Sequence, residues 1–334
     1  MKINRTILVL SAIGAAALAG DATAQALWDS AKIPQPHLEK ALKYAAQENS
    51  WRHPGVSPCY WDDGQPASNL SRDLPGTKMF DNLYYVGNGK YGVFALDTSE
   101  GIILIDAMNN QDEVDRFIIP NMKSVGLDPA RLKVLIVSHG HADHFGGSRY
   151  IQDKYHVRVY MSAADWDHAQ RLAGRPDQGP PARRDLTVAD GDTITFGDVS
   201  IKVYVSPGHT PGSLSMLIPV KDHGRAKLLA YFGGVNSKGL TPEMHAAFDK
   251  SYDRLISIAG QTRPDGYLAA HPLYDDAVFK TEWLRANPTF PNAFLVGTPN
   301  VVSFLHEVKE CNLNSADLER AMPARKSSGN VPTR

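Results

Sequence analysis

Potential metal ligands are concentrated in residues 139–144, which contain three histidines and one aspartate. Four such residues at this spacing argue against histidines that merely happen to cluster. Neutral imidazole and carboxylate are ligands that suit zinc. On an extended loop, two residues spaced i, i+2 can bind one ion while the next two face a neighbouring ion. The spacing of His139, His141, Asp143 and His144 therefore predicts a site for two metal ions.

The segments on either side of these ligands indicate how they are positioned. Residues 132–137 form an apolar run rich in β-branched side chains, which is typical of a buried strand. Gly146 and Gly147 follow the ligands and permit backbone conformations that residues with a Cβ avoid. We therefore expect the ligands on a loop at the end of a strand, on a rigid edge of a sheet.

The His-x-His-x-Asp-His pattern of residues 139–144 resembles the signature loop of the metallo-β-lactamase-fold hydrolases. A second loop supports the resemblance, because His209 lies in a Pro-Gly-His-Thr-Pro-Gly segment after an apolar strand. His271 again follows an apolar run, at residues 266–270. The resemblance implies two Zn²⁺ ions per chain, one bound by His139, His141 and His209 and the other by Asp143, His144 and His271.

Other parts of the sequence indicate a subclass of this family. Members with a cysteine ligand need a cysteine near the site, and Cys311 lies in a predicted helix too late in the chain. Glyoxalase- and lactonase-type members usually supply a bridging aspartate after the strand at residues 227–232, where this chain has Gly233 and Gly234. A ligand set made only of histidine and aspartate resembles the third subclass of metallo-β-lactamases.

The two glycines are also a departure from that subclass, whose members carry serines here that help to bind the β-lactam carboxylate. Asn236 and Ser237 could replace those serines as polar donors, or they could be ordinary loop residues. Asp106 follows an apolar run at residues 102–105, where the family usually has a buried aspartate that supports the metal loop. The alternative for Asp106 is a turn residue at the end of a strand.

The order of predicted elements begins with a meander of strands at residues 83–86, 91–98 and 101–105 and continues with alternating strands and helices. A helix is predicted at residues 110–125, with Pro120 splitting or kinking it. The order and the resemblance predict an α/β (α+β) fold: an αββα sandwich of two mixed β-sheets flanked by helices. The predicted parts are a signal peptide at 1–24, an N-terminal wrapping segment at 25–76, a metallo-β-lactamase-like domain at 77–322 and a flexible tail at 323–334.

The N-terminal residues have the features of a secretory signal peptide. Lys2 and Arg5 precede an apolar run at residues 6–19, and Ala22-Thr23-Ala24 offers a cleavage site. A membrane anchor is the alternative, but the run is shorter than the ~20 residues of a spanning helix. We therefore expect a periplasmic or secreted protein that has no membrane segment after cleavage.

Composition narrows the expected partners. With 35 Lys and Arg against 36 Asp and Glu, the chain has a formal net charge of −1 and no polybasic segment. Nucleic acid is therefore not an expected partner, because affinity for it depends on Lys and Arg. Cys59 and Cys311 are the two cysteines of the sequence, and either a disulfide or two independent buried thiols fits an exported protein.

The resemblance implies hydrolysis of a small-molecule substrate by a metal-bound hydroxide, with Asp143 as the catalytic residue that orients the water. No Gly-x-Ser-x-Gly motif in the sequence indicates a serine nucleophile. We therefore expect an exported binuclear zinc hydrolase that opens a cyclic amide such as a β-lactam. The alternatives are a zinc-dependent lactonase or esterase, a non-catalytic metal-binding protein, and an iron redox enzyme. Flavin-linked relatives of that last kind commonly carry Glu in place of His141.

Overall fold

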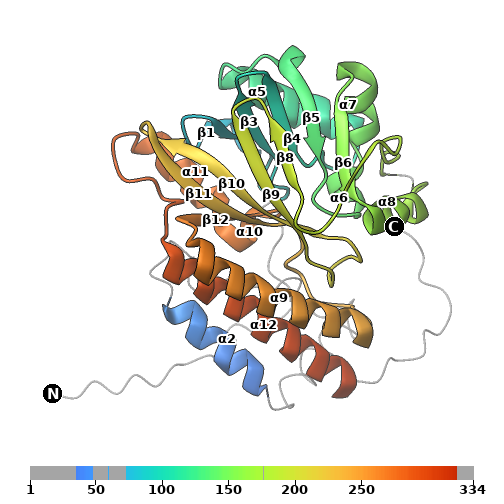
Figure 1. Ribbon diagram of the computed structural model, residues 1–334, viewed down its shortest axis with the longest axis vertical. Helices are drawn as coiled ribbons and strands as arrows, with labels where there is room; N and C mark the ends of the chain where they lie inside the picture. Colours follow the sequence, from blue (N-terminus) through green and yellow to red (C-terminus); the bar gives the residue numbers. More distant parts are fainter. Residues whose placement is uncertain (1–34, 48–58, 60–72, 176, 322–334) are drawn as a thin grey trace, which may run out of the picture. The chain divides into compact units, whose positions relative to one another are not determined.

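The computed structural model describes residues 35–47, 59, 73–175 and 177–321. The predicted signal peptide, most of the predicted wrapping segment and the predicted tail lie outside the described residues. In the described part, two β-sheets face each other and helices cover their outer faces (Figure 1). The predicted αββα sandwich of two mixed sheets is therefore confirmed.

The first sheet contains seven strands that are neighbours in chain order, β1 to β7. Strands β1 to β4 pair antiparallel, whereas β4 to β7 pair parallel. The loops that follow β4, β5 and β6 consequently leave the sheet at the same edge. The strands are β1 Thr77–Lys78, β2 Leu83–Tyr85, β3 Phe94–Thr98, β4 Gly101–Ile105, β5 Leu132–Ile136, β6 Arg158–Ser162 and β7 Leu186–Val188.

The second sheet has the order β12-β11-β10-β9-β8, in which only the β11–β12 pair is parallel. The loops after β9, β11 and β12 leave this sheet at one edge. Strand β10 was missed by the sequence analysis, because Pro219 within it is typical of turns and edge strands. The strands are β8 Thr193–Phe196, β9 Val199–Val205, β10 Leu214–Asp222, β11 Arg225–Phe232 and β12 Gly266–Ala269.

The main apolar core fills the space between the sheets, where Ile103 and Ile136 of the first sheet share a cluster with Met216 of the second. A second cluster joins the outer face of the first sheet to its helices, and a third joins the second sheet to α9 and α12. Figure 1 shows α9, α12 and α2 side by side beneath the second sheet. These helices are α2 Pro36–Gln47, α9 Pro242–Thr262 and α12 Thr298–Ala321, and those of the first sheet include α7 Ser148–Tyr155 and α8 Ala163–Leu172.

The helix predicted at residues 110–125 is divided into three short segments. A π-helical turn at Val114–Ile118 separates α4 (Gln111–Glu113) from α5 (Ile119–Ser124). Pro120 occupies the first turn of α5, directly after the π-helical turn, and cannot donate an N–H to a preceding carbonyl. The prediction that Pro120 splits the helix is confirmed. Two further helices, α10 (Pro272–Asp275) and α11 (Ala277–Ala286), follow β12.

A disulfide joins Cys59 to Cys311 of α12, with 4.8 Å between their Cα atoms. Ala41 of α2 packs against this pair. The disulfide therefore ties a residue of the predicted N-terminal segment to the C-terminal helix. Among the described residues, no helix has the length and apolar character needed to cross a membrane.

Candidate metal centre

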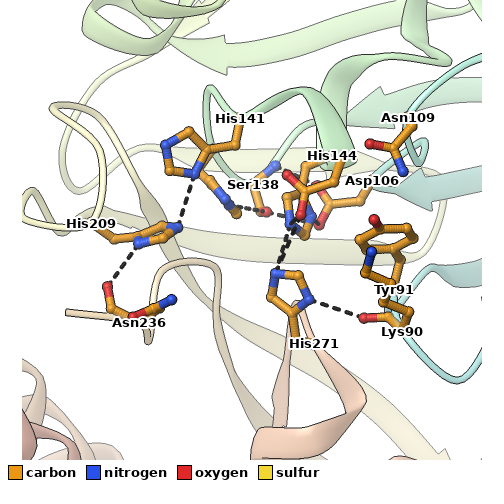
Figure 2. A network of polar contacts seen from close by, with 12 residues as sticks. Lys90, Tyr91, Asp106, Asn109, Ser138, His141, His144, His209, Asn236 and His271 are labelled. Atoms are coloured by element: carbon orange, nitrogen blue, oxygen red, sulfur yellow. Dashed lines mark hydrogen bonds and ion pairs between the residues drawn. The ribbon is translucent and has the colours of Figure 1, made fainter. Parts of the chain in front are cut away.

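The six predicted ligand residues come together where segments from both sheets meet. Figure 2 labels four of them: His141, His144, His209 and His271. Residues 139–144 follow β5 of the first sheet. His209 follows β9 and His271 follows β12, both in the second sheet. The centre is therefore assembled across the sandwich from three segments, and the expectation of a loop holds only for His139 and His141 in the first of them, because Asp143 and His144 lie in the short helix α6 (Ala142–Phe145).

His139, His141 and His209 form the first group of converging side chains, hereafter the first set. Their ligand atoms lie within 4.8 Å of one another, and His141 Nδ1 is 3.0 Å from His209 Nε2. His209 Nδ1 donates to the backbone carbonyl of Asn236 at 2.7 Å, so its Nε2 carries a lone pair. His139 Nε2 is buried and has no hydrogen-bond partner. A cation bound by the three rings would satisfy that nitrogen.

Asp143, His144 and His271 form the second set. His144 Nε2 lies 3.5 Å from Asp143 Oδ2 and 3.2 Å from His271 Nε2, and His271 Nε2 lies 3.6 Å from Asp143 Oδ2. Ligands about 2.0–2.1 Å from a tetrahedral zinc ion are roughly 3.3 Å apart, so these separations fit one ion. His139 also lies within 4.8 Å of Asp143 and His144, which places it next to both sets.

The partners of the second-set rings decide which nitrogens face a common point where a metal could bind. His271 Nδ1 donates to the Lys90 carbonyl at 3.0 Å, and His144 Nδ1 faces Asp106 Oδ2 at 2.9 Å. Both Nε2 atoms then direct lone pairs at each other across 3.2 Å, which is unfavourable unless a cation or a proton lies between them. The residues therefore fit a bound metal ion, and the nitrogen and oxygen donors suit zinc.

Burial and neighbouring charges divide the ligands into two kinds. Burial lowers the pKa of His139 and His209 well below the usual value, and lowers that of His141 to about 4. Burial also acts on His144, but the Asp143 carboxylate outweighs it, and the pKa of His144 rises to about 10. Burial would raise the pKa of Asp143, yet His144 outweighs burial and holds it well below its usual value. At neutral pH the first set is therefore uncharged and ready to bind a cation, whereas metal-free His144 is protonated.

Asp106 supports the metal loop from beneath. It follows β4 in a left-handed conformation (φ 67°), and its Oδ1 accepts from the Ser138 backbone N–H at 2.7 Å. Its Oδ2 accepts from Ser138 Oγ, from Tyr231 and from His144 Nδ1 at 2.8 to 2.9 Å. Asp106 therefore fixes both the backbone before His139 and the ring orientation of His144. Sequence reasoning missed Tyr231. Its position at the end of β11, with the side chain facing inward, is the signal that could have indicated its role.

A model of the metallo-beta-lactamase superfamily matches residues 87–223, which contain five of the six ligand residues. Residues 87–223 are therefore similar to this superfamily. Solved structures with the same fold include a HARLDQ-motif mutant metallo-β-lactamase of Cronobacter sakazakii (TM-score 0.67, 21% identity, 77% of this chain and 100% of that one). They also include BJP-1, a subclass B3 metallo-β-lactamase of Bradyrhizobium japonicum (TM-score 0.59, 24% identity, 77% and 95%).

Curated relatives of the chain have different activities. An N-acyl homoserine lactonase, AttM of Azorhizobium caulinodans, is 28% identical over 33% of this chain and 44% of its own length. A hydroxyacylglutathione hydrolase of Francisella philomiragia is 26% identical over 52% and 58%. The human mitochondrial persulfide dioxygenase ETHE1 is 31% identical over 38% and 42%. The match thus spans only about half the length of each of these relatives.

The loop after β11 carries the two residues that are predicted to contact the substrate. Ser237 is only 5% exposed, and its Oγ donates to Ser315 of α12 at 3.4 Å. Asn236 uses its backbone carbonyl to fix His209, and its Oδ1 accepts from Lys238 N. This loop packs back onto α12, and a contact between Ser237 and a substrate stays a prediction. The Asn236 backbone carbonyl orients the candidate ligand His209.

Gly233 and Gly234 allow this loop to pass close to the metal centre. A Cβ on Gly234 would lie 2.6 Å from the Cβ of His209, and one on Gly233 would lie 2.7 Å from the Leu214 carbonyl. Neither position therefore has room for a serine unless the neighbouring groups move. Close packing therefore favours glycine at both positions.

The rim of the centre carries a tyrosine and a lysine that sequence reasoning missed. The Tyr91 ring lies 5.8 Å from the His271 ring, and Lys90 Nζ lies 5.0 Å from the Tyr91 ring centre (Figure 2). Both residues line a hollow of about 380 Å³ that also contains Arg116, Asp112 and Glu113. Arg116 pairs with Asp73, whereas the described residues offer Lys90 Nζ no ion-pair partner. In the sequence, only the turn at residues 87–91 could have drawn attention to Lys90 and Tyr91.

Proposed function

We propose that this protein is an exported binuclear zinc hydrolase that opens a cyclic amide such as a β-lactam. The observation that carries the proposal is the two sets of candidate ligand atoms, each with imidazole nitrogens that lie close to one another. All six residues are present and four of the histidines have partners outside the ligand set, so a binding protein that has lost catalysis is the weaker alternative. His141 in the first set argues against an iron redox enzyme.

Zinc, when bound, supplies the Lewis acidity that makes water a nucleophile near neutral pH and polarises a substrate carbonyl. The protein fixes the geometry for this chemistry through Asp106, Asn236 and the Lys90 carbonyl, each of which orients one histidine. Asp143 is ionised, so its carboxylate can orient the attacking water and accept its proton. The chain therefore needs no serine nucleophile.

The residues around the metal centre should determine which substrate is bound. The close-packed Gly233-Gly234 loop offers no serine to a β-lactam carboxylate, which makes a lactone or another ester the second candidate. The AttM lactonase among the relatives is consistent with that second candidate. Lys90, whose backbone carbonyl contacts His271, forms no ion pair within the described residues, so we expect its side chain to meet an anionic group of the substrate.

A substrate panel tests the proposed function directly. Protein loaded with two equivalents of zinc would be assayed on penicillins, on N-acyl lactones and on thioesters, each as anionic and neutral pairs. We expect ring opening of β-lactams, with the anionic member preferred. Efficient lactone cleavage without β-lactam turnover would favour the lactonase as the function. Full zinc loading without turnover of any substrate would contradict a hydrolase.

Export is a separate part of the proposal, supported by the basic and apolar N-terminal sequence. Expression of the full chain in a bacterial host, followed by intact-mass measurement of the periplasmic fraction, tests it. We expect a mature chain that begins at Gln25. An uncleaved protein found in the cytosolic fraction would contradict export.

A further inference from the structure

Asp165, in the first turn of α8, makes contacts that no ligand residue makes. Its side chain is buried, and its backbone N–H donates to Ser162, the residue that caps the helix. Asp165 Oδ2 accepts from Gly140 N at 2.8 Å and from Thr210 Oγ1 at 2.6 Å, and its Oδ1 accepts from Gly212 N at 2.8 Å. One carboxylate therefore bonds to two loops that come from different sheets.

Two of these three bonds end next to a residue of the first set, and the third ends at Gly212 in the loop that carries His209. Gly140 lies between His139 and His141, and Thr210 directly follows His209. The approach needs glycine, because a Cβ on Gly212 would lie within 3 Å of Ser162 Oγ and of Asp165 N. Asp165 thus determines how far the His209 loop lies from the loop that carries the other two histidines.

The loops of the second set are held by different carboxylates. Asp106 contacts His144. Asp275 is also fully buried and accepts from Ala269 N at 2.9 Å and from Ala277 N at 3.1 Å, which fixes the turn that carries His271. Asp275 is therefore a matched control for Asp165: a buried carboxylate that holds backbone N–H groups beside a ligand, but a ligand of the other set.

We propose that Asp165 is a positioning residue that ties together the two loops of the first set and thereby sets the metal affinity of His139, His141 and His209. The proposal rests on the metal-binding part of the proposed function and not on the substrate. An asparagine at position 165 can accept fewer bonds and would leave a buried N–H group without an acceptor. Loss of such outer partners typically weakens metal binding about 10–100-fold.

The test measures zinc affinity by competition with a chromophoric chelator, so it needs no turnover. Each set is read alone: the first in a His271→Ala background and the second in a His209→Ala background. We expect Asp165→Asn to weaken the first set about 10–100-fold and to leave the second set within about threefold. Asp275→Asn should show the reverse pattern.

Equal weakening of both sets by Asp165→Asn would overturn the proposal, since a general loss of packing would act on both. Unchanged zinc affinity of the first set in Asp165→Asn would overturn the proposal as well. If Asp165→Asn fails to fold, Thr210→Val removes one of the three bonds, and we expect a smaller loss confined to the first set. If the wild-type protein binds zinc in both sets but hydrolyses no substrate, the proposed function is contradicted, whereas the positioning role of Asp165 is not.

Discussion

His144 and His271 are 127 positions apart in the sequence, yet their Nε2 atoms lie 3.2 Å apart. His144 follows β5 of the first sheet, and His271 follows β12 of the second. Both rings use Nδ1 to contact the protein, so the facing nitrogens are the ones left for a metal. An ion bound here would therefore link the two sheets as well as serve the chemistry, and metal removal should lower the stability of the fold.

The division of ligands predicts which ion each variant loses. The wild-type protein should contain about two equivalents of zinc, His209→Ala should lose mainly the first-set ion, and His271→Ala mainly the second-set ion. Elemental analysis combined with Co²⁺ spectra of each variant would distinguish the two sites. Identical metal loss and identical spectra in the two variants would contradict this division, and so would a wild-type protein that takes up only one equivalent.

Proton release should differ between the two sets. Because the pKa of metal-free His144 is raised to about 10, this ring is protonated at pH 7 and must lose a proton when zinc binds. The affinity of the second set should therefore fall about tenfold for each unit of pH lost below 9. His141, with a pKa of about 4, is already neutral, so the zinc affinity of the first set should depend little on pH above pH 6.

Calorimetry in buffers of different ionisation enthalpy measures this proton release. The His271→Ala variant reports the first set and the His209→Ala variant reports the second. About one proton more should be released by the second set at pH 7. Equal release by both sets would show that the Asp143–His144 pair does not raise the pKa of His144 as described.

Asp143→Asn tests the proposed catalytic residue. The amide cannot accept a proton from water and binds a cation more weakly, so we expect turnover to fall at least about 10²-fold. Zinc in the second set should also bind more weakly, while the first set keeps its ion. The assay must be run at saturating zinc, and full activity there would remove the acid–base role of Asp143.

The sequence predicted the clustering of the six candidate ligand residues and the fold better than it predicted the groups around them. The metal loop is a short local pattern, and the β-branched run before it determines its strand, so both could be predicted from spacing. The role of Tyr231 and the bonds of Asp165 depend on contacts between elements far apart in the chain. The inward turn of Ser237 depends on Ser315, 78 positions later, and no local pattern reveals such a contact.

The Cys59–Cys311 disulfide should stabilise the folded protein. It closes a segment of 252 positions, and disulfides that close long segments typically contribute about 2–4 kcal/mol. A Cys59→Ser/Cys311→Ser variant should therefore unfold at a lower denaturant concentration than wild type. Reducing agent should lower the stability of the wild type to about that of the variant and leave the stability of the variant unchanged. Equal stability of the two proteins under non-reducing conditions would contradict this contribution.

Gly234→Ser would restore a hydroxyl where subclass relatives carry one, but we do not expect it to improve substrate binding. The new Cβ would lie 2.6 Å from His209 Cβ and 2.8 Å from Ser213 Oγ, so His209 would have to move. We therefore expect weaker zinc binding in the first set and a lower kcat/KM, with no decrease in KM for penicillins. Gly260→Ser is the control, because a Cβ on that exposed helical glycine meets no atom within 4 Å. A Gly234→Ser variant with full zinc content and a lower KM than wild type would show instead that the loop can move and that the missing hydroxyl limits β-lactam binding.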